Sequence, residues 1–599
     1  MLCMKLFLQL SGAFFRPADS SIGDPKTQTE SFKIRSASRG GSRALVLTTA
    51  APMVVLFVAT TALSSGRARN ETLTVKEPEL PRAFVDTKFP STAGYTEVSV
   101  PAGGNLKSAI DQASCNPTGT VLMLAAGASF TGSFTLPAKN CAPGQWIIIR
   151  TDVPDSALPA EDTRINPSYA PKLAKILSPN VAPAIKTASG AEHYWFMGVE
   201  IGAAENAPMS YGVFVIGHEE AALADLPHHI VVDRCYVHGN ASGAIKRGVE
   251  ANGASVAVIN SYLENFHVVG QDTQAVAAWN SPGPIKIVNN FLEASGENVM
   301  FGGAVPFVPN IIASDLEIRR NYFFKPLSWR AGDPSFAGTT WTVKNILEFK
   351  NAQRVLVEGN VMENNWAQAQ SGFAVLFTPR GQRERCPWCT VADVTFRFNI
   401  LAHSGSGFNI AGQDDTSTSQ PSQRIWIHDN LVLDINSKRW GGDGRLYQIL
   451  NGPRARALPP PQDIVISHNT GFESGAVIMV GDTPDHPVRN FLFVDNIQPH
   501  GASGIFGSGA RPGVGAILTY FADSAFTHNV FADLPSRVSP ADYPPGNFFP
   551  SDIDELFAGA KSGDFHLKPT SRYHGAGTDG KDIGADIDAV MSATAGVAP

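Results

Sequence analysis

One short pattern recurs between residues 285 and 531 and constrains the fold more than any other feature of the sequence. Each copy has the form apolar-x-apolar-x-x-Asn-x-apolar, as in IKIVNNFL (285–292) and VLVEGNVM (355–362). Its asparagines are Asn290, Asn321, Asn360, Asn399, Asn430, Asn469, Asn496 and Asn529, at intervals of 27 to 39 residues. Helical repeats keep a fixed period, so intervals this variable exclude them. One strand and one asparagine per repeat are typical of a parallel β-solenoid, whose coils stack about 4.8 Å apart so that their asparagines can bond to one another.

A second strand is predicted between successive copies of this pattern, in blocks such as ILEFKN (346–351), AVLFTP (374–379) and GFNIAG (407–412). The second and fourth positions of these blocks are apolar nearly throughout. Because side chains alternate between the two faces of a strand, we expect these positions to fill the solenoid interior. The third and fifth positions then face outward. In the first block they are Glu348 and Lys350, a carboxylate and an ammonium on one outer face.

Composition and charge narrow the classes of function. The chain is 43% hydrophobic and 17% charged, with 55 glycines and 42 prolines, which fits a turn-rich β protein. The formal net charge is −7, and no basic patch follows the N-terminus. Nucleic-acid binding needs a concentrated cationic face, so we expect no nucleic-acid partner. We expect the protein to be a monomer.

Residues 1–70 are predicted to be a targeting segment. Basic residues precede an uncharged run of 20 residues, 44–63, and small residues follow it. This order is that of a cleaved secretory signal. The run is also long enough to span a bilayer, so a membrane anchor is the alternative, although Pro52 and the threonines of the run favour cleavage. Either interpretation predicts that the rest of the chain lies outside the cytoplasm.

The six cysteines fit an oxidising compartment. Cys115 and Cys141 flank one β-like segment and are predicted to form a disulfide. Cys386 and Cys389 form a CxxC motif, which is either a redox pair or a small disulfide that closes a loop. No thioredoxin-like βαβ pattern surrounds the motif, so the loop disulfide is favoured. Cys235 is predicted to be a single buried thiol.

Several longer segments resemble a bacterial secreted family with the pectin lyase-like fold, the right-handed parallel β-helix. They are SGENVMFGG (295–303), KPLSWR (325–330), KNILEFKNAQRVLVEGNVMENNW (344–366) and GFAVLFTPR (372–380). We therefore expect an all-β, right-handed parallel β-helix with a short N-terminal capping helix near residues 105–113. The cap and first strands would occupy residues 71–140, the β-helix 141–550 and a closing segment 551–599. The resemblance implies action on an acidic polysaccharide, although we know no established substrate for the family.

The longest predicted loops lie between Asn321 and Ile464 and surround Glu348 and Lys350. β-Elimination of a uronic-acid polymer needs a base for the C5 proton, a cation for the carboxylate and an acid for the leaving oxygen. Lys350 is the candidate base, and Arg380 is the candidate cation or acid, a division of labour similar to that of the alginate lyase and chondroitinase B group. The candidate substrate-binding residues are Trp279, Lys325, Arg330, Lys344, Asn409 and Gln448. Glu348 is the candidate ligand of a Ca²⁺ ion.

Three alternatives stay open at this point. Glu348 and Lys350 can form an exposed ion pair worth less than about 1 kcal/mol. The protein can be a non-catalytic surface module that binds glycans, with Trp279 either stacking on a sugar or packed under a loop. It can also be a glycoside hydrolase, which needs two carboxyl groups about 5–9.5 Å apart. Asp414 and Asp415 would then have to approach Glu348.

Overall fold

The computed structural model describes residues 75–204, 209–452 and 459–599. The predicted targeting segment, residues 1–70, lies outside the described residues. Within the described residues no helix is both long enough and apolar enough to span a membrane.

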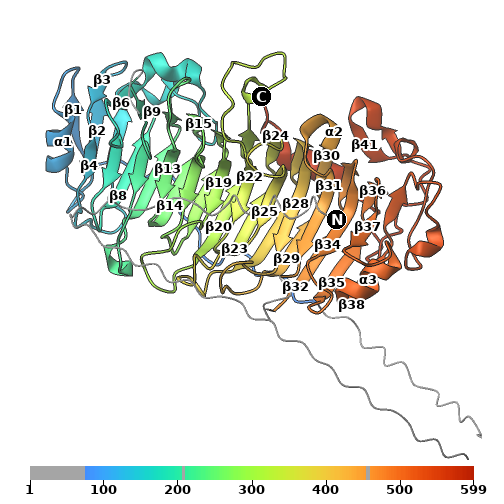
Figure 1. Ribbon diagram of the computed structural model, residues 1–599. Coiled ribbons are helices and arrows are strands. Elements are labelled where there is room, and N and C mark those ends of the chain that lie inside the picture. Colours follow the sequence, from blue (N-terminus) through green and yellow to red (C-terminus); the bar gives the residue numbers. More distant parts are fainter. Residues whose placement is uncertain (1–74, 205–208, 453–458) are drawn as a thin grey trace, which may run out of the picture. The chain divides into compact units, whose positions relative to one another are not determined.

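The described chain coils into three parallel sheets, here named A, B and C, with each coil adding one strand to each sheet (Figure 1). Sheet A holds β1 (Thr96–Val100), β2 (Thr120–Leu124), β5 (Ile147–Thr151), β8 (Glu192–Met197), β11 (His228–Asp233), β14 (Ala254–Ile259), β17 (Ile285–Val288), β20 (Ala313–Arg319), β23 (Ala352–Glu358), β26 (Val391–Arg397), β29 (Gln423–His428), β32 (Gln462–Ser467), β35 (Val488–Val494) and β38 (Phe521–Thr527). Sheet B holds β3 (Ser129–Thr131), β6 (Ala174–Ser178), β9 (Val199–Ala203), β12 (Tyr236–His238), β15 (Tyr262–Phe266), β18 (Phe291–Ala294), β21 (Tyr322–Phe324), β24 (Val361–Asn365), β27 (Ile400–Ser404), β30 (Leu431–Ile435), β33 (Thr470–Glu473), β36 (Ile497–Pro499) and β39 (Val530–Ala532). Sheet C holds β4 (Phe134–Leu136), β7 (Ile185–Thr187), β10 (Phe214–Ile216), β13 (Arg247–Ala251), β16 (Gln274–Ala278), β19 (Glu297–Phe301), β22 (Asn345–Phe349), β25 (Phe373–Phe377), β28 (Ser406–Ala411), β31 (Arg445–Leu450), β34 (Ala476–Gly481) and β37 (Ile505–Gly507). The fold is therefore the predicted right-handed parallel β-helix.

Apolar side chains of all three sheets form one continuous core along the solenoid. In sheet C the predicted inner positions are buried, and the rings of Phe349 and Phe377 on adjacent coils stack with centroids 5.5 Å apart. Full burial of one such side chain contributes about 1.5–3 kcal/mol. Stacking of similar apolar side chains on adjacent coils therefore stabilises each coil against its two neighbours.

The predicted asparagines form an unbroken ladder at the turn between sheets A and B. Each side-chain amide donates to the Oδ1 of the next asparagine at 2.9–3.1 Å. The ladder continues to Asn547, whose Oδ1 accepts from Asn529 Nδ2 at 3.1 Å, a residue outside the repeat pattern. The residue before each asparagine has a left-handed backbone or is glycine, as at His468 (φ 50°) and His528 (φ 56°). This geometry explains the two histidines as turn residues.

Different elements cover the two ends of the core. At the N-terminal end, α1 (Leu106–Gln112) buries Leu106 and Ile110, as the capping-helix prediction required. The Cys115–Cys141 disulfide joins the chain after α1 to the loop after β4. At the other end, α3 (Val514–Tyr520) packs against β37 and buries Tyr520. The closing segment holds β40 (Phe557–Gly559), β41 (Asp564–Leu567) and α4 (Ile587–Thr594). It packs along the asparagine turn and against sheet B, including Val530 and Ala532 in β39 of the last coil.

Residues 75–89 run along the edge where the strands of sheet A begin. Three backbone amides donate to aspartates of every second coil: Lys76 to Asp463 (3.2 Å), Glu79 to Asp393 (3.2 Å) and Arg82 to Asp315 (2.9 Å). Three extended residues span about 10 Å, close to two coil spacings of about 4.8 Å. The segment therefore matches the solenoid repeat and fastens several coils together.

Candidate functional site

Sheet C forms one long face of the solenoid, and Glu348, Asn409 and Gln448 occupy its outward positions. One outward row runs in register across neighbouring coils: Glu250, Ala277, Met300, Glu348, Leu376, Asn409, Gln448 and Met479. Loops before β22 and β31 border this face where its strands begin. The loops after β25 and β28 border it where its strands end.

Lys350 and Glu348 form an ion pair in this row, with 2.9 Å between Nζ and Oε2. The side chains are only 14% and 2% exposed, so the pair is not the exposed surface pair that one interpretation expected. Asn345 Nδ2 donates to the same carboxylate at 3.1 Å, and Thr378 Oγ1 donates to its other oxygen at 3.4 Å. Both oxygens of the Glu348 carboxylate therefore have partners, and the ion pair holds the Lys350 ammonium in one position.

Two glycines make room for Lys350. Gly302 and Gly303 have φ of +90° and +88°, a left-handed conformation that glycine adopts without strain. A Cβ atom on Gly302 would lie 2.9 Å from Cβ of Lys350. Beside this gap, Lys350 Nζ lies 3.6 Å from Sδ of Met300. The SGENVMFGG segment thus shapes the surroundings of the lysine.

Lys344, a predicted substrate-binding residue, is bound within the protein. Its Nζ lies 2.8 Å from both Asp272 Oδ2 and Glu297 Oε1. Gln274 Nε2 donates to the other oxygen of Glu297 at 2.7 Å. Burial alone would raise the pKa of Glu297, but Lys344 and Lys350 outweigh burial and hold it at about 2. Glu297 therefore stays ionised, and Lys344 is occupied by two carboxylates rather than free for substrate.

Trp279, the predicted sugar-stacking residue, is 8% exposed and packs inside the face. The guanidinium of Arg247 lies over its ring, 4.8 Å from the centroid. Arg247 also donates to Gln274 Oε1 at 2.9 Å and pairs with Glu250 at 3.1 Å. Trp279 therefore supports an arginine network and offers no open platform.

Arg380 lies on the coil after Lys350, and its backbone amide donates to the Lys350 carbonyl at 3.1 Å. Its side chain is 33% exposed, and Nη1 lies 3.0 Å from Asp415 Oδ1 and 3.5 Å from Asp414 Oδ1. Asp414 also accepts the Gly381 amide at 2.8 Å. Both aspartates therefore face Arg380 and are engaged by it, and the hydrolase interpretation stays an alternative.

Asn409 and Gln448 lie side by side on the next two coils, and Gln448 Nε2 donates to Asn409 Oδ1 at 3.3 Å. Arg445 donates to the other end of the Gln448 amide and pairs with Asp443 at 3.1 Å. Asn409 is half-buried, so this part of the row is open enough to contact a ligand. Arg445 is not among the residues predicted from the sequence, although it begins β31, the strand that carries Gln448.

Lys325 is a correction to the predicted substrate-binding set. It is fully buried, because it turns inward at the corner between sheets B and C. Its Nζ donates to the carbonyls of Ala294 (2.7 Å) and Gly296 (2.8 Å) and to Asn298 Oδ1 (2.8 Å). Burial lowers the pKa of Lys325 to about 7. Lys325 therefore satisfies the backbone of a turn and cannot reach a substrate.

Arg330 belongs to a hollow in the bordering loops rather than to the row around Lys350. Its guanidinium lies 4.6 Å from the ring centroid of Trp440. The hollow, of about 310 Å³, is also lined by Trp366, Lys438 and Arg439. Three cations and two tryptophans thus border the strand-start side of the face.

The residues around Glu348 do not fit a calcium site. Ca²⁺ takes six to eight oxygen ligands. Both oxygens of Glu348 already serve Lys350, Asn345 and Thr378. We derive no metal-dependent step from this site.

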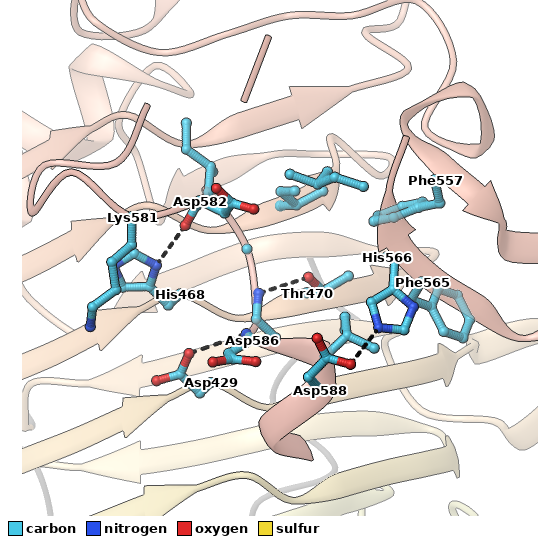
Figure 2. A pocket seen from close by; sticks show the side chains of 16 residues that line it. Asp429, His468, Thr470, Phe557, Phe565, His566, Lys581, Asp582, Asp586 and Asp588 are labelled. Atoms are coloured by element: carbon cyan, nitrogen blue, oxygen red, sulfur yellow. Dashed lines mark hydrogen bonds and ion pairs between the residues drawn. The ribbon is translucent and has the colours of Figure 1, made fainter. Parts of the chain in front are cut away.

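A second pocket, of about 400 Å³, lies between the closing segment and the asparagine turn (Figure 2). Its polar groups hold the segment in place: Asp582 O accepts from His468 Nδ1 (3.0 Å), Ala585 N donates to Thr470 Oγ1 (3.0 Å) and Asp586 N donates to Asp429 Oδ1 (3.3 Å). These hydrogen bonds show that the pocket lies at the contact between the closing segment and the solenoid. The candidate functional site is therefore placed on sheet C.

The chain was compared with known families, sequences and solved structures. No protein-family model matches the chain, and no curated protein sequence is similar to it. A solved alginate lyase from Paenibacillus sp. str. FPU-7 is similar with a TM-score of 0.28 and 12% identity, over 76% of this chain and 98% of the lyase. A PL6 family alginate lyase, AlyGC, is similar with a TM-score of 0.44 and 13% identity, over 82% of this chain and 58% of that chain. The catalytic unit of a GH87 alpha-1,3-glucanase from Streptomyces thermodiastaticus has a TM-score of 0.45 and 11% identity, over 78% and 72%. The parallel β-helix itself is identified from the three sheets described above.

Proposed function

We propose that the protein binds an acidic polysaccharide along the outer face of sheet C and cleaves it by β-elimination. The observation that carries the proposal is the placing of Lys350 and Arg380 on adjacent coils, joined by the 3.1 Å bond from the Arg380 amide to the Lys350 carbonyl. Both cations lie on a polar face bordered by loops, the usual home of a binding site. The two disulfides support a location outside the cytoplasm.

In this proposal Arg380 binds the uronate carboxylate. Asp415 is 63% exposed, so an incoming carboxylate can replace it on the guanidinium fork while Asp414 keeps the arginine in place. Neutralising the uronate makes the C5 proton easier to remove, because the negative charge that develops beside it is stabilised. Asp414 is thus a positioning residue, and Arg380 contacts substrate.

Lys350 removes the C5 proton. The electron pair of the C5–H bond forms the C4–C5 double bond, and the C4–O bond breaks. The proton on Lys350 is then available to the leaving oxygen. Before the reaction the ammonium of Lys350 must lose a proton, and Glu348, 2.9 Å away, or solvent can accept it. Asn409, Gln448 and Arg445 would bind the polymer on the following coils.

A non-catalytic glycan-binding role is the second candidate, and the charge balance of the face favours it. Lys344 is matched by Asp272 and Glu297, and Lys350 is matched by Glu348. A face whose cations are already neutralised has little net attraction for an anionic polymer. Binding would then depend on the exposed cations of the bordering loops.

The test is to incubate the protein with alginate, pectate and glycosaminoglycans, and to follow ultraviolet absorbance, reducing ends and binding in parallel. β-Elimination predicts absorbance from the unsaturated uronate together with new chain ends. New reducing ends without absorbance would replace the proposal with hydrolysis. Retention on an immobilised polymer with neither product would favour the binding role.

A further inference from the structure

Four side chains of metal-binding types stand at the starts of β8 and β11, two neighbouring strands of sheet A in the N-terminal part of the solenoid (Figure 1). Glu192 and His193 open β8, and His228 and His229 open β11. Glu192 is paired in register with His228, so His193 faces His229. The four residues therefore form a two-by-two array on adjacent coils, far along the solenoid from the candidate active site.

The side chains converge on one small volume. His193 Nδ1 lies 2.9 Å and His228 Nε2 3.8 Å from Glu192 Oε2, and Nδ1 of His228 lies 2.8 Å from Nδ1 of His229. One nitrogen from each of the three histidines lies within 4.8 Å of the other two. Zn²⁺ binds imidazole nitrogen at about 2.0–2.1 Å, which places tetrahedral ligands about 3.3 Å apart. Small side-chain rotations would therefore close this array around one ion.

The same corner of later coils carries side chains of opposite charge. There Arg354 pairs with Asp315 at 2.7 Å, and Arg424 pairs with Asp393. His193 and His229 occupy this corner with the same left-handed backbone, φ 57° and 54°. Their rings stack with centroids 4.5 Å apart and planes only 3° apart. Instead of one arginine–aspartate pair, the corner here brings three imidazoles together beside a single carboxylate, that of Glu192.

Outer contacts fix the array in place. The Cys141 amide donates to Glu192 Oε1 at 3.3 Å, and Cys141 is tied to Cys115 by a disulfide. On the preceding coil the ring of Trp146 meets the edge of His193 at 5.1 Å. Hydrogen bonds of this kind orient metal ligands and strengthen metal sites.

We propose that Glu192, His193, His228 and His229 bind one Zn²⁺ ion. The three imidazole nitrogens would fill three of the four positions of Zn²⁺, and Glu192, whose Oε2 lies 2.9 Å from His193 Nδ1, is the candidate for the fourth. The ion would link two coils beside the N-terminal disulfide. This inference does not depend on the polysaccharide activity.

The test uses the full chain without a histidine tag, stripped with EDTA and titrated with ZnCl₂ in a calorimeter. We expect one Zn²⁺ per chain and a higher thermal midpoint for the loaded protein, because the ion binds only the folded state. His193→Gln and His228→Gln should each weaken binding at least about tenfold. In the unaltered protein, Co²⁺ should give the strong visible bands of four-coordinate cobalt, a readout that needs no variant.

His468→Gln is the matched control, because His468 lies with Asp495 and Asp579 in a separate acidic cluster. It should bind Zn²⁺ like the unaltered chain. Absence of saturable Zn²⁺ uptake by the unaltered chain would overturn the proposal. Equal affinity in both array variants, or loss of binding only in His468→Gln, would also overturn it.

Discussion

At the scale of single residues, the structure shows that charged side chains in this solenoid are mostly committed to internal partners. Lys325 donates to two carbonyls and one amide oxygen within a buried corner, each at 2.7–2.8 Å. Lys344 and Lys350 are likewise held by carboxylates at 2.8–2.9 Å. Arg380, by contrast, keeps a third of its side chain exposed beside Lys350 and can meet a ligand.

Lys325→Met should destabilise the protein, because the substitution leaves buried carbonyl oxygens without donors. Each unsatisfied buried group costs about 1–3 kcal/mol. We expect a lower thermal midpoint and a lower urea midpoint. Lys186→Met is the control, since Lys186 is an exposed lysine in β7 of sheet C. Equal midpoints for the two variants would contradict the assigned role of Lys325.

His267 should make the protein less stable in mild acid. It is fully buried against Trp341, with ring centroids 3.9 Å apart, and burial lowers its pKa from 6.5 to about 4. Between these pH values the unfolded chain binds more protons, so this contribution is full above about pH 6.5 and is lost as pH falls toward 4. The loss amounts to about 3 kcal/mol. Unfolding at pH 7 and pH 5 should show a smaller pH effect in His267→Phe, and parallel losses would refute the assignment.

At the scale of elements, the asparagine ladder determines how the coils stack. An interior member such as Asn399 donates to Asn430 and accepts from both the amide and the side chain of Asn360. The last member, Asn547, has a neighbour on one side only and is partly exposed. Loss of an interior member therefore removes the acceptor of two donors on the preceding coil and a donor to the asparagine of the next coil.

Asn399→Ala should lower the unfolding free energy by several kcal/mol, because about 1–3 kcal/mol is lost for each buried group left unpaired. Asn547→Ala, at the end of the ladder, should have a clearly smaller effect. Urea denaturation followed by circular dichroism measures both. A loss at Asn547 as large as that at Asn399 would show that the ladder does not act as a chain of coupled bonds.

At the scale of the whole molecule, the features that repeat in every coil can be predicted from the sequence, and the features of individual corners cannot. Strand alternation placed Leu347 and Phe349 inside and Glu348 outside, because each coil repeats the same pattern. A residue that faces outward from the sheet is not necessarily exposed to solvent. The Glu348 side chain is only 2% exposed, because it is covered by its partners on the same face. The inward turn of Lys325 and the Arg247 network over Trp279 arise from corner geometry that no repeat encodes. Extending the aligned strand blocks by one position at their start would have included Arg247, Gln274, Glu297 and Arg445, which all stand at strand starts.

The measurement that tests the central claim is the initial rate of unsaturated-uronate formation by the unaltered protein, Lys350→Ala and Lys186→Ala on one cleaved polymer. Lys186 lies on the outer face of the same sheet, in register with Val215 and hence with the Glu348 row. We predict that Lys350→Ala lowers kcat at least about 100-fold, the usual contribution of a general base, while Lys186→Ala leaves it unchanged. Equal rates in all three proteins would contradict the assignment of the reaction to Lys350 and to this face of sheet C.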